Sequence, residues 1–408
     1  MKLMYLTVGI DLGIDTVHCG VWYANSTNYN KAEIVRFLSG SWSQRVSVNF
    51  NYNPPVCGVP SSDAIDSIGR FIGLKYNDPQ VQYQLENESF HFNIIEGEDG
   101  GCLFEIETKL SDEKKYLTPE TILSIFLKNL CLDILREIGL RNDVILRCVV
   151  AVPDNYTNEQ KHAVKVSCEM ANMEVVSIIH KSIASVYAYS AENKWNGCCL
   201  VYDIQEKSFD VSLLKMERSG RKITLLTTNE DIHIGGDYFD KNFYLKILDV
   251  WKSKDPVNNH VKYFEIDSED TADVKREKQQ RIFELRKLAE KAKIELCTYF
   301  ETEIDLSEYY NGKDYSLTIT REDFEDYNKS WFEATFDISL QTIKTAGISL
   351  KEVKNIVLVG KNTHIPNLYE MFEEYFPFAR VNANFDASLV AAIGATKYAR
   401  DWICSNVE

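Results

Sequence analysis

Two aspartates, Asp11 and Asp203, supply carboxylates at two places where an apolar run gives way to a turn. Each directly follows an apolar run that predicts a buried strand, and each is followed by a short turn and a second strand-like run. The four runs are residues 5–10, 19–23, 198–202 and 209–214. The sequence therefore predicts two hairpins of the same build, about 190 residues apart.

The repeated hairpin favours two lobes of similar construction. The alternative is two unrelated hairpins in which Asp11 and Asp203 only close the turns by local hydrogen bonds. The segments that follow predict helices interleaved with buried strands, so a mixed α/β fold is expected. The predicted helices are residues 119–138, 158–172, 274–300 and 322–345, and the predicted strands are residues 144–152 and 355–360. In the fourth helix, Phe324, Tyr327 and Trp331 are among the residues expected to face inward. Residues 255–273 are polar and predict a loop.

Composition narrows the class of protein. The net charge of −16 disfavours nucleic-acid backbones and anionic membranes as partners, although a well-solvated acidic surface explains the same charge. The ten cysteines are scattered without CxxC spacing, which indicates reduced thiols and a cytoplasmic location, with the nucleus as the alternative compartment. No secretory signal is visible, and the charges within residues 122–138 favour a core helix over a membrane span.

Six stretches resemble motifs of the nucleotide-binding domain of the heat-shock 70-kDa chaperones, in the same order. They are VGIDLGIDTVHCGVWY, VVAVPDNYTNEQKHAVK, VYDIQEKSFDVSLL, DIHIGGDYFD, LAEKAKIELC and IVLVGKNTHIP. The resemblance implies the two-lobed actin-like ATPase fold, in which duplicated ribonuclease-H-like subdomains carry smaller inserted subdomains around a nucleotide cleft. It places lobe I at residues 1–192, with an insertion at about 40–115, and lobe II at residues 193–408, with a helical insertion at about 232–327. The C-terminal helix is expected to return towards lobe I.

Both phosphate-binding turns depart from the family pattern. The first keeps Gly13, but Ile14 and Asp15 stand where the family has two threonines. In the second turn, three residues replace three glycines whose lack of a Cβ lets the backbone approach a triphosphate. These residues are Gln205, Glu206 and Lys207. The replacements predict loss of ATP affinity. The alternative is that the Lys207 side chain binds phosphate in place of the missing amides.

The positions that the family uses for hydrolysis also differ. Gly69 stands at the place of the lysine that orients the attacking water, and Lys181 at the place of the cleft glutamate. Catalytic residues are therefore not expected. By resemblance, three carboxylates would organise magnesium only if a nucleotide binds, and otherwise would serve as turn residues. They are Asp11, Asp203 and Asp210.

The nucleoside side of the cleft is half retained. Six residues match the family's residual nucleotide contacts: Gly13, Gly235, Gly236, Glu290, Lys293 and Gly360. Five others are replacements, namely Ile294, Cys297, Lys361, Asn362 and His364. The two glycines at 235 and 236 would also serve plain packing, and Glu290 and Lys293 would also suit a solvated helix face. The seven histidines show no metal-ligand spacing.

The resemblance also shapes the expected function. The sequence ends where the family continues into a peptide-binding domain, and Ser177 replaces the arginine used with J-domain partners. We therefore expect a pseudo-ATPase that serves as an interaction scaffold or co-chaperone, without cofactor, for a ribosome, a cytoskeletal assembly or a chaperone system. The helical insertion is the expected contact surface. The alternatives are a slow ATPase and a sensor that binds Mg-ATP or ADP without hydrolysis.

Overall fold

The computed structural model describes most of the chain. The described residues are 4–22, 32–37, 39–59, 61, 63–87, 90, 92–141, 144–193, 195–220, 222–254, 264–267, 269–307 and 316–406. The chain forms two compact units: unit 1 comprises Met1–Cys199, Leu214–Leu226 and Ser388–Glu408, and unit 2 comprises Leu200–Leu213 and Thr227–Ala387. The lobe and insertion boundaries expected from the sequence stay a prediction.

Unit 1 is built on a mixed sheet with the strand order β11-β10-β1-β2-β3, to which β4 adds by pairing with β2. The strands are β1 (Tyr5–Leu12), β2 (Thr16–Trp22), β3 (Ala32–Ile34), β4 (Gln44–Arg45), β10 (Ile145–Val152) and β11 (Glu174–His180). β1, β10 and β11 are parallel, so their carboxyl ends lie at one edge of the sheet. That edge carries Asp11, Asp154 and His180.

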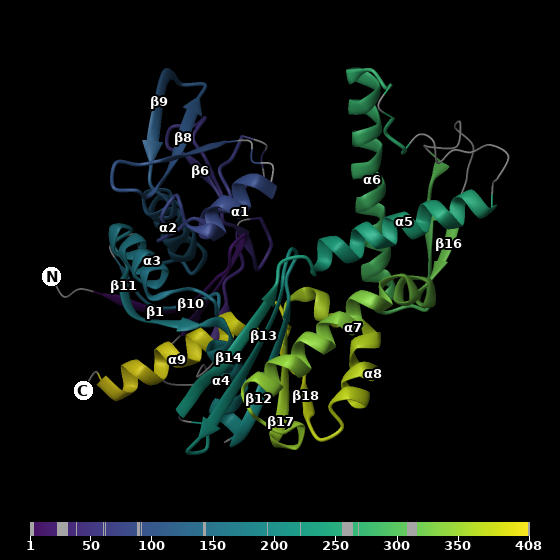
Figure 1. The fold of residues 1–408 in the computed structure, drawn as a ribbon. Helices are drawn as coiled ribbons and strands as arrows, with labels where there is room; N and C mark the ends of the chain where they lie inside the picture. The colour runs from purple at the N-terminus through teal and green to yellow at the C-terminus, as the bar shows by residue number, and fades with distance from the viewer. Residues whose placement is uncertain are drawn as a thin grey trace. The chain divides into compact units, whose positions relative to one another are not determined.

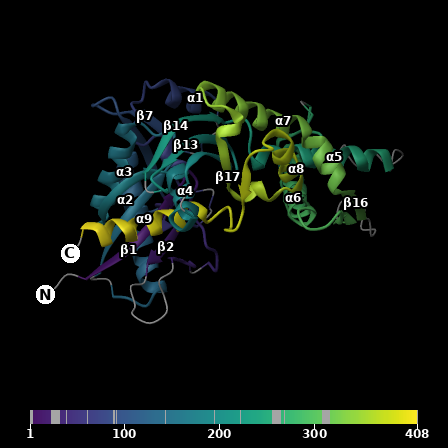
Figure 2. The same ribbon diagram turned by 90° about the horizontal axis from the view of Figure 1, so that it is seen from below.

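Helices α4 (Lys181–Asn193) and α9 (Val390–Asn406) pack on each other, and α9 lies along β1 and β2 (Figures 1 and 2). Glycine makes this approach possible. A Cβ on Gly394 would lie 1.7 Å from the carbonyl oxygen of Ala184, and a Cβ on Gly9 would lie 2.1 Å from the amide nitrogen of Thr396. A larger residue at position 394 or 9 would therefore force α9 away from α4 or from the sheet.

Helices α2 (Pro119–Glu137) and α3 (Asn158–Met170) pack together in the same unit. Thr118 caps α2, and its side chain accepts a hydrogen bond from the Thr121 amide. The apolar side chains of α2 are buried, which confirms a core helix. Among the described residues, no helix combines the length and apolarity that a bilayer crossing requires.

A smaller part of unit 1 is formed by the residues between β4 and α2 in the sequence. It holds α1 (Pro79–Asn87), the 3₁₀ helix η1 (Ile68–Arg70), and the strands β5 (Val48–Asn49), β6 (Val56–Cys57), β7 (Asn93–Glu96), β8 (Cys102–Thr108) and β9 (Ser111–Leu117). Its core is aromatic: the rings of Phe71 and Phe104 meet edge to face at 5.6 Å, with Phe90 and Phe92 beside them.

The second sheet has the order β14-β13-β12-β17-β18. Its strands are β12 (Gly197–Ile204), β13 (Phe209–Glu217), β14 (Lys222–Asp231), β17 (Val353–Val359) and β18 (Arg380–Asn382). On it pack α7 (Arg321–Thr345) and α8 (Pro366–Tyr375). The 3₁₀ helix η4 (Leu350–Glu352) lies between α7 and β17, and η5 (Lys361–His364) lies between β17 and α8. Tyr202 of β12 is fully buried against Phe336 and Phe372 of these helices.

The remaining part of unit 2 contains α5 (Gly236–Lys254), α6 (Ala272–Leu296), β15 (Glu301–Asp305) and β16 (Ser316–Thr320). In it, α6 packs on α5 (Figure 1). It also packs on β15. Of the loop predicted at 255–273, residues 255–263 and 268 lie outside the described residues, and α6 already begins at Ala272 because Thr271 caps it. The helix ends at Leu296 instead of continuing to residue 300.

Three further expectations can be compared with the structure. Both predicted hairpins form, as β1–β2 and β12–β13, although Tyr23 lies outside the described residues. All ten cysteines lie within the described residues and carry thiols that form no disulfide. The inward position predicted for Tyr327 is wrong: the residue is 36% exposed, because its hydroxyl donates a hydrogen bond to Asp249 and its ring lies below the Lys246 ammonium.

Candidate functional site

Asp11 lies at the carboxyl end of β1 and is almost fully buried. Nδ1 of His18, on the paired strand, lies 3.6 Å from its Oδ2. Burial raises the pKa of Asp11, but the positive charge of Lys181 and the contact with His18 outweigh it, so the net pKa is lowered. Asp11 is therefore ionised at neutral pH, and its buried Oδ1 has no hydrogen-bond partner among the described residues.

The first turn uses its own polar groups. The amide of Gly13 donates to the carbonyl of Thr16 at 3.0 Å, and a Cβ on Gly13 would lie 2.9 Å from that oxygen. The carbonyl of Asp15 accepts from the amide of Val46 at 2.8 Å. Gly13 is thus required by the hairpin itself, independently of any ligand.

The two positions at which the family carries catalytic groups are filled differently. The carbonyl of Gly69 accepts a hydrogen bond from the Tyr156 hydroxyl at 2.7 Å. A Cβ on Gly69 would lie 2.8 Å from that hydroxyl and 3.3 Å from the Cα of Ile14, so a side chain has little room there. Lys181, the first residue of α4, acts electrostatically on Asp11.

The sequence analysis missed a polar cluster at the same edge of unit 1. Nζ of Lys161 lies 3.0 Å from Nε2 of His180, and Nδ1 of His180 lies 3.8 Å from Oδ1 of Asp154. The same Asp154 oxygen accepts from the amide of Ser182, at the start of α4, at 3.0 Å. Burial and the Lys161 charge lower the pKa of His180 against the opposing effect of Asp154, so this histidine is neutral at pH 7.

The sequence held a partial signal for this cluster. Asp154 follows the predicted strand at residues 144–152, and His180 ends β11, a strand that was not predicted, so the two meet at the carboxyl edge of the sheet. Lys161 comes from the first turn of the next helix and could only be placed once α3 was packed against the sheet.

In unit 2, the second turn is hydrogen-bonded to the helix that follows it. The amide of Gly236 donates to the carbonyl of Gln205 at 2.9 Å, and the amide of Asp237 donates to the carbonyl of Glu206 at 2.8 Å. The Gln205 side chain donates to Asp203. Protein carbonyl groups therefore satisfy amides at the start of α5 that would otherwise be available to an anion.

The retained glycines are explained by close packing within unit 2. A Cβ on Gly235 would lie 2.6 Å from the carbonyl oxygen of Glu206, and one on Gly236 would lie 2.4 Å from the side chain of Asn362. Gly360 has a positive φ of 82°, and a Cβ there would lie 2.2 Å from the carbonyl oxygen of Ile204. These three glycines are necessary for the protein's own packing.

An ion-paired group covers the second turn. Nζ of Lys361 lies 3.0 Å from Oε1 of Glu206 and 4.0 Å from Oε1 of Glu290. Burial lowers the pKa of Lys361, but Glu206 and Glu290 outweigh this and the net pKa is raised. The lysine is therefore fully charged at neutral pH, and its charge is matched by carboxylates of the same unit.

A second group of contacts in unit 2 is nearly buried. Nζ of Lys293 lies 2.7 Å from Oδ1 of Asp240 and donates to Oδ1 of Asn362 at 3.2 Å. The Asn362 amide group donates to the Gln205 carbonyl at 3.1 Å. Burial raises the pKa of Asp240, and Lys293 opposes this. Lys293, which the sequence assigned to a nucleoside, is thus engaged by its own chain.

The predicted site residues divide between the two units. Unit 1 holds Asp11, Gly13, Gly69 and Lys181, and unit 2 holds Asp203, Asp210, Gly235, Gly236, Glu290, Lys293 and Gly360. Within unit 2, the Ser208 hydroxyl donates to Asp210 at 3.1 Å. Ile294 is 60% exposed, and His364 lies 4.0 Å from Asp386. Among the described residues, no group of three or more acidic, histidine or cysteine side chains has an arrangement that could hold a metal ion.

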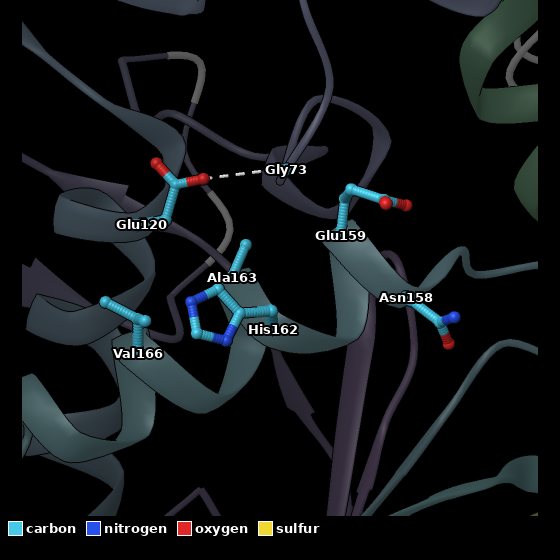
Figure 3. Close-up of a pocket in the computed structure, with 7 residues that line it drawn as sticks. All are labelled: Gly73, Glu120, Asn158, Glu159, His162, Ala163 and Val166. Atoms are coloured by element: carbon cyan, nitrogen blue, oxygen red, sulfur yellow. Dashed lines mark hydrogen bonds between the residues drawn. The ribbon is translucent and has the colours of Figure 1, made fainter.

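A separate cavity of about 560 Å³ lies in unit 1 between the start of α2 and α3 (Figure 3). The amide of Gly73 donates to Oε1 of Glu120 at its wall, at 3.1 Å. None of the residues that line this cavity was predicted from the sequence as a site residue. The lining residues are Gly73, Glu120, Asn158, Glu159, His162, Ala163 and Val166.

Comparison with known proteins identifies the relatives of the chain. The chain is 28% identical to a protein of Pyricularia oryzae named as a heat shock protein, and 26% identical to a "ribosome-associated molecular chaperone" of Zygosaccharomyces rouxii, in both cases over 95% of its own length. It is 30% identical to "Heat shock 70 kDa protein 2" of Paracoccidioides lutzii, also over 95%. The chain spans 60%, 60% and 56% of the lengths of these three relatives.

A model of the family described as "Hsp70 protein" matches residues 7–400, which is almost the whole chain. Together with the mixed sheets and their covering helices, this match confirms the expected two-lobed actin-like ATPase fold. The chain belongs to the Hsp70 family.

Proposed function

We propose that this Hsp70-family chain is a pseudo-ATPase: a folded module that acts through protein contacts and neither binds ATP in the family's manner nor hydrolyses it. The observation that carries the proposal is the set of protein contacts around Glu206. Its carboxylate stands where the family has a glycine, it pairs with Lys361, and its carbonyl receives the Asp237 amide. Groups that would contact a triphosphate are thus engaged by the protein.

The magnitudes support weak affinity. A phosphate oxygen about 4 Å from a carboxylate costs about 4 kcal/mol at an effective dielectric of about 20. Each lost hydrogen bond to a charged group costs roughly 1.5–3 kcal/mol. Micromolar binding amounts to only about 8 kcal/mol in total. The loss of the family's hydroxyl donor at position 14 and of its glycines at positions 205–207 is therefore enough to move ATP binding into the millimolar range or beyond.

The residues present do not fit Mg-ATP as a substrate either. Phosphoryl transfer depends on positioned charges around the attacking water and the transferred group. Gly69 offers only a backbone carbonyl that is bound to Tyr156, and Lys181 offers a cation whose charge acts on Asp11. We derive no catalytic step at this site.

The relatives supply the class of partner. Several are named ribosome-associated molecular chaperones, from Zygosaccharomyces rouxii, Eremothecium gossypii and Saccharomyces cerevisiae. On that basis we propose that the chain works in the cytoplasm as a scaffold or co-chaperone in a ribosome or chaperone assembly. Its charge of −16 disfavours direct contact with nucleic acid or an anionic membrane.

A second candidate function is nucleotide sensing or weak hydrolysis of Mg-ATP. One observation favours it. Asp11 is buried and ionised, and no residue in the described part of the chain forms a hydrogen bond with its Oδ1. A buried carboxylate oxygen in this condition would gain from a hydrated cation. By resemblance to the family, Asp203 and Asp210 are the further carboxylates that this candidate retains.

Calorimetric titration of the full chain with Mg-ATP and Mg-ADP separates the two functions. We expect no saturable heat at physiological concentrations. The matched control is Asp203→Ala, which removes a carboxylate that the second candidate requires. Saturable binding by the natural chain that Asp203→Ala abolishes would establish the second candidate and overturn the first.

A further inference from the structure

We propose that Lys361 and Asn362 form a built-in tie that holds helix α6 against the edge of the second sheet without any ligand. The two residues begin the loop after β17, at one side of unit 2. The β17 loop tie comprises these two residues and the groups that they contact: Gln205 and Glu206 of the β12–β13 turn, and Glu290 and Lys293 of α6.

Asn362 is the central residue of the tie. Its Oδ1 accepts from Lys293 of α6, its Nδ2 donates to the carbonyl of Gln205 in the β12–β13 turn, and its side chain abuts Gly236 at the start of α5. One side chain, 4% exposed, thereby connects three segments that are far apart in sequence. Buried side-chain amides with both ends satisfied fix geometry strongly, because each lost partner leaves an uncompensated polar group.

The tie has an inner and an outer layer with different physical properties. In the inner layer, the Lys293 side chain is 8% exposed and Asn362 is 4% exposed, so salt screens the contact between them weakly. In the outer layer, the Lys361 side chain is 56% exposed and its partners Glu206 and Glu290 are 40% and 47% exposed. Exposed ion pairs contribute little and are screened by salt. The inner layer is therefore expected to contribute more than the outer layer to holding α6 in place.

The tie matters for α6 because of how this helix is supported. α6 packs on α5 and β15, which belong to the same part of unit 2. The contacts of Glu290 and Lys293 with the loop after β17 join that part to the second sheet. We infer that the tie fixes α6, and the surface that α6 presents to a protein partner, in one position at all times.

Hydrogen exchange measured by mass spectrometry on the full chain tests the tie, with peptides that cover residues 285–296. In buffer without nucleotide, Asn362→Ala is expected to raise exchange there about tenfold or more, because a bond to a charged group is lost. Lys361→Ala is expected to raise it less, and this smaller effect disappears at about 1 M salt, where the screening length is about 3 Å.

Two matched controls separate the tie from general destabilisation. Asn382→Ala removes another buried asparagine of unit 2, one that bridges β17 and β18. Lys222→Ala removes an exposed lysine whose pair with Glu217 is as exposed as the pair Lys361–Glu206. Neither control is expected to change exchange in residues 285–296.

The proposal is overturned if exchange of α6 in Asn362→Ala equals that of the natural chain, or if Asn382→Ala raises it equally. If Asn362→Ala does not fold, Asn362→Asp retains the acceptor for Lys293 and removes only the donor to the Gln205 carbonyl, so a smaller increase is expected, and unchanged exchange would overturn the proposal. Because the exchange is measured without nucleotide, a negative result would leave the proposed lack of ATP binding untouched.

Discussion

Nζ of Lys361 lies 3.0 Å from Oε1 of Glu206, so two residues that both stand at glycine positions of the family pair with each other. Either residue alone would place an unbalanced charge beside the second turn. Together their charges cancel. The carbonyl groups of the turn accept hydrogen bonds from the first amides of α5. The two departures from the family pattern are therefore best understood as one structural unit.

The retained glycine at 360 is expected to be required for folding, whether or not a ligand binds. Gly360→Ala forces a Cβ to within 2.2 Å of the Ile204 carbonyl at a φ of 82°. We expect a loss of more than about 3 kcal/mol in the free energy of unfolding. The control Gly139→Ala has a similar φ of 69° and nothing within 4 Å of the added Cβ, so it should cost only about 1–2 kcal/mol. Denaturant unfolding measures both variants, and equal losses would contradict the prediction.

Gly69 and Tyr156 are expected to be energetically coupled. Gly69→Ala places a Cβ 2.8 Å from the Tyr156 hydroxyl, and overpacking of this kind costs about 1–3 kcal/mol. Tyr156→Phe removes that oxygen together with its hydrogen bond to the Gly69 carbonyl. The double variant should therefore lose less stability than the sum of the two single losses. Strict additivity in a double-mutant cycle would show that the close contact has no energetic weight.

Lys181 is expected to stabilise the protein through Asp11, with a defined pH dependence. The folded pKa of Asp11 is lowered, so its contribution is present above the unfolded pKa and is lost as pH falls through the folded pKa. In Lys181→Glu, repulsion raises the pKa of Asp11 and makes the ionised form unfavourable. The loss in melting temperature should thus be largest near pH 7 and should shrink as the pH is lowered towards about 5.

Two companion variants test this explanation. Lys181→Met removes the attraction without adding repulsion, so it should show a smaller loss at pH 7. Adding Asp11→Asn to Lys181→Glu should abolish the difference between the two pH values. A loss that is the same at both pH values in Lys181→Glu would mean that Asp11 is not the partner.

The sequence predicted local features better than the contacts of the site. Apolar runs that end in Asp11 and Asp203 were enough for both hairpins, because strand periodicity is encoded within each run. The bond from Asn362 to the Gln205 carbonyl spans 157 residues and has no local pattern. The sequence predicted that Tyr327 faces the core because its ring is apolar. In the structure its hydroxyl donates a hydrogen bond to Asp249 at the surface.

The final prediction concerns recovery of nucleotide binding by restoring the family's turn residues. The first variant carries Ile14→Thr, Asp15→Thr and glycine at 205, 206 and 207. These changes remove two negative charges and the side chains of the second turn, and they return hydroxyl donors. On the sequence alone they would be expected to restore binding, but the structure adds an obstacle, because Asn362 would still abut Gly236 and hold Lys293.

We therefore expect this five-residue variant to bind Mg-ATP weakly, and a variant that also carries Lys361→Gly and Asn362→Ser to bind at least about tenfold more tightly, which corresponds to about 1.4 kcal/mol. Calorimetry measures both affinities, and a melting curve must show that each variant is folded, since each new glycine costs about 0.5–1 kcal/mol. Turnover should stay undetectable in both, because Gly69 and Lys181 are unchanged. Equal affinities of the two variants would mean that the loop after β17 does not obstruct the nucleotide, and measurable phosphate release would mean that hydrolysis needs neither of the family's residues at 69 and 181.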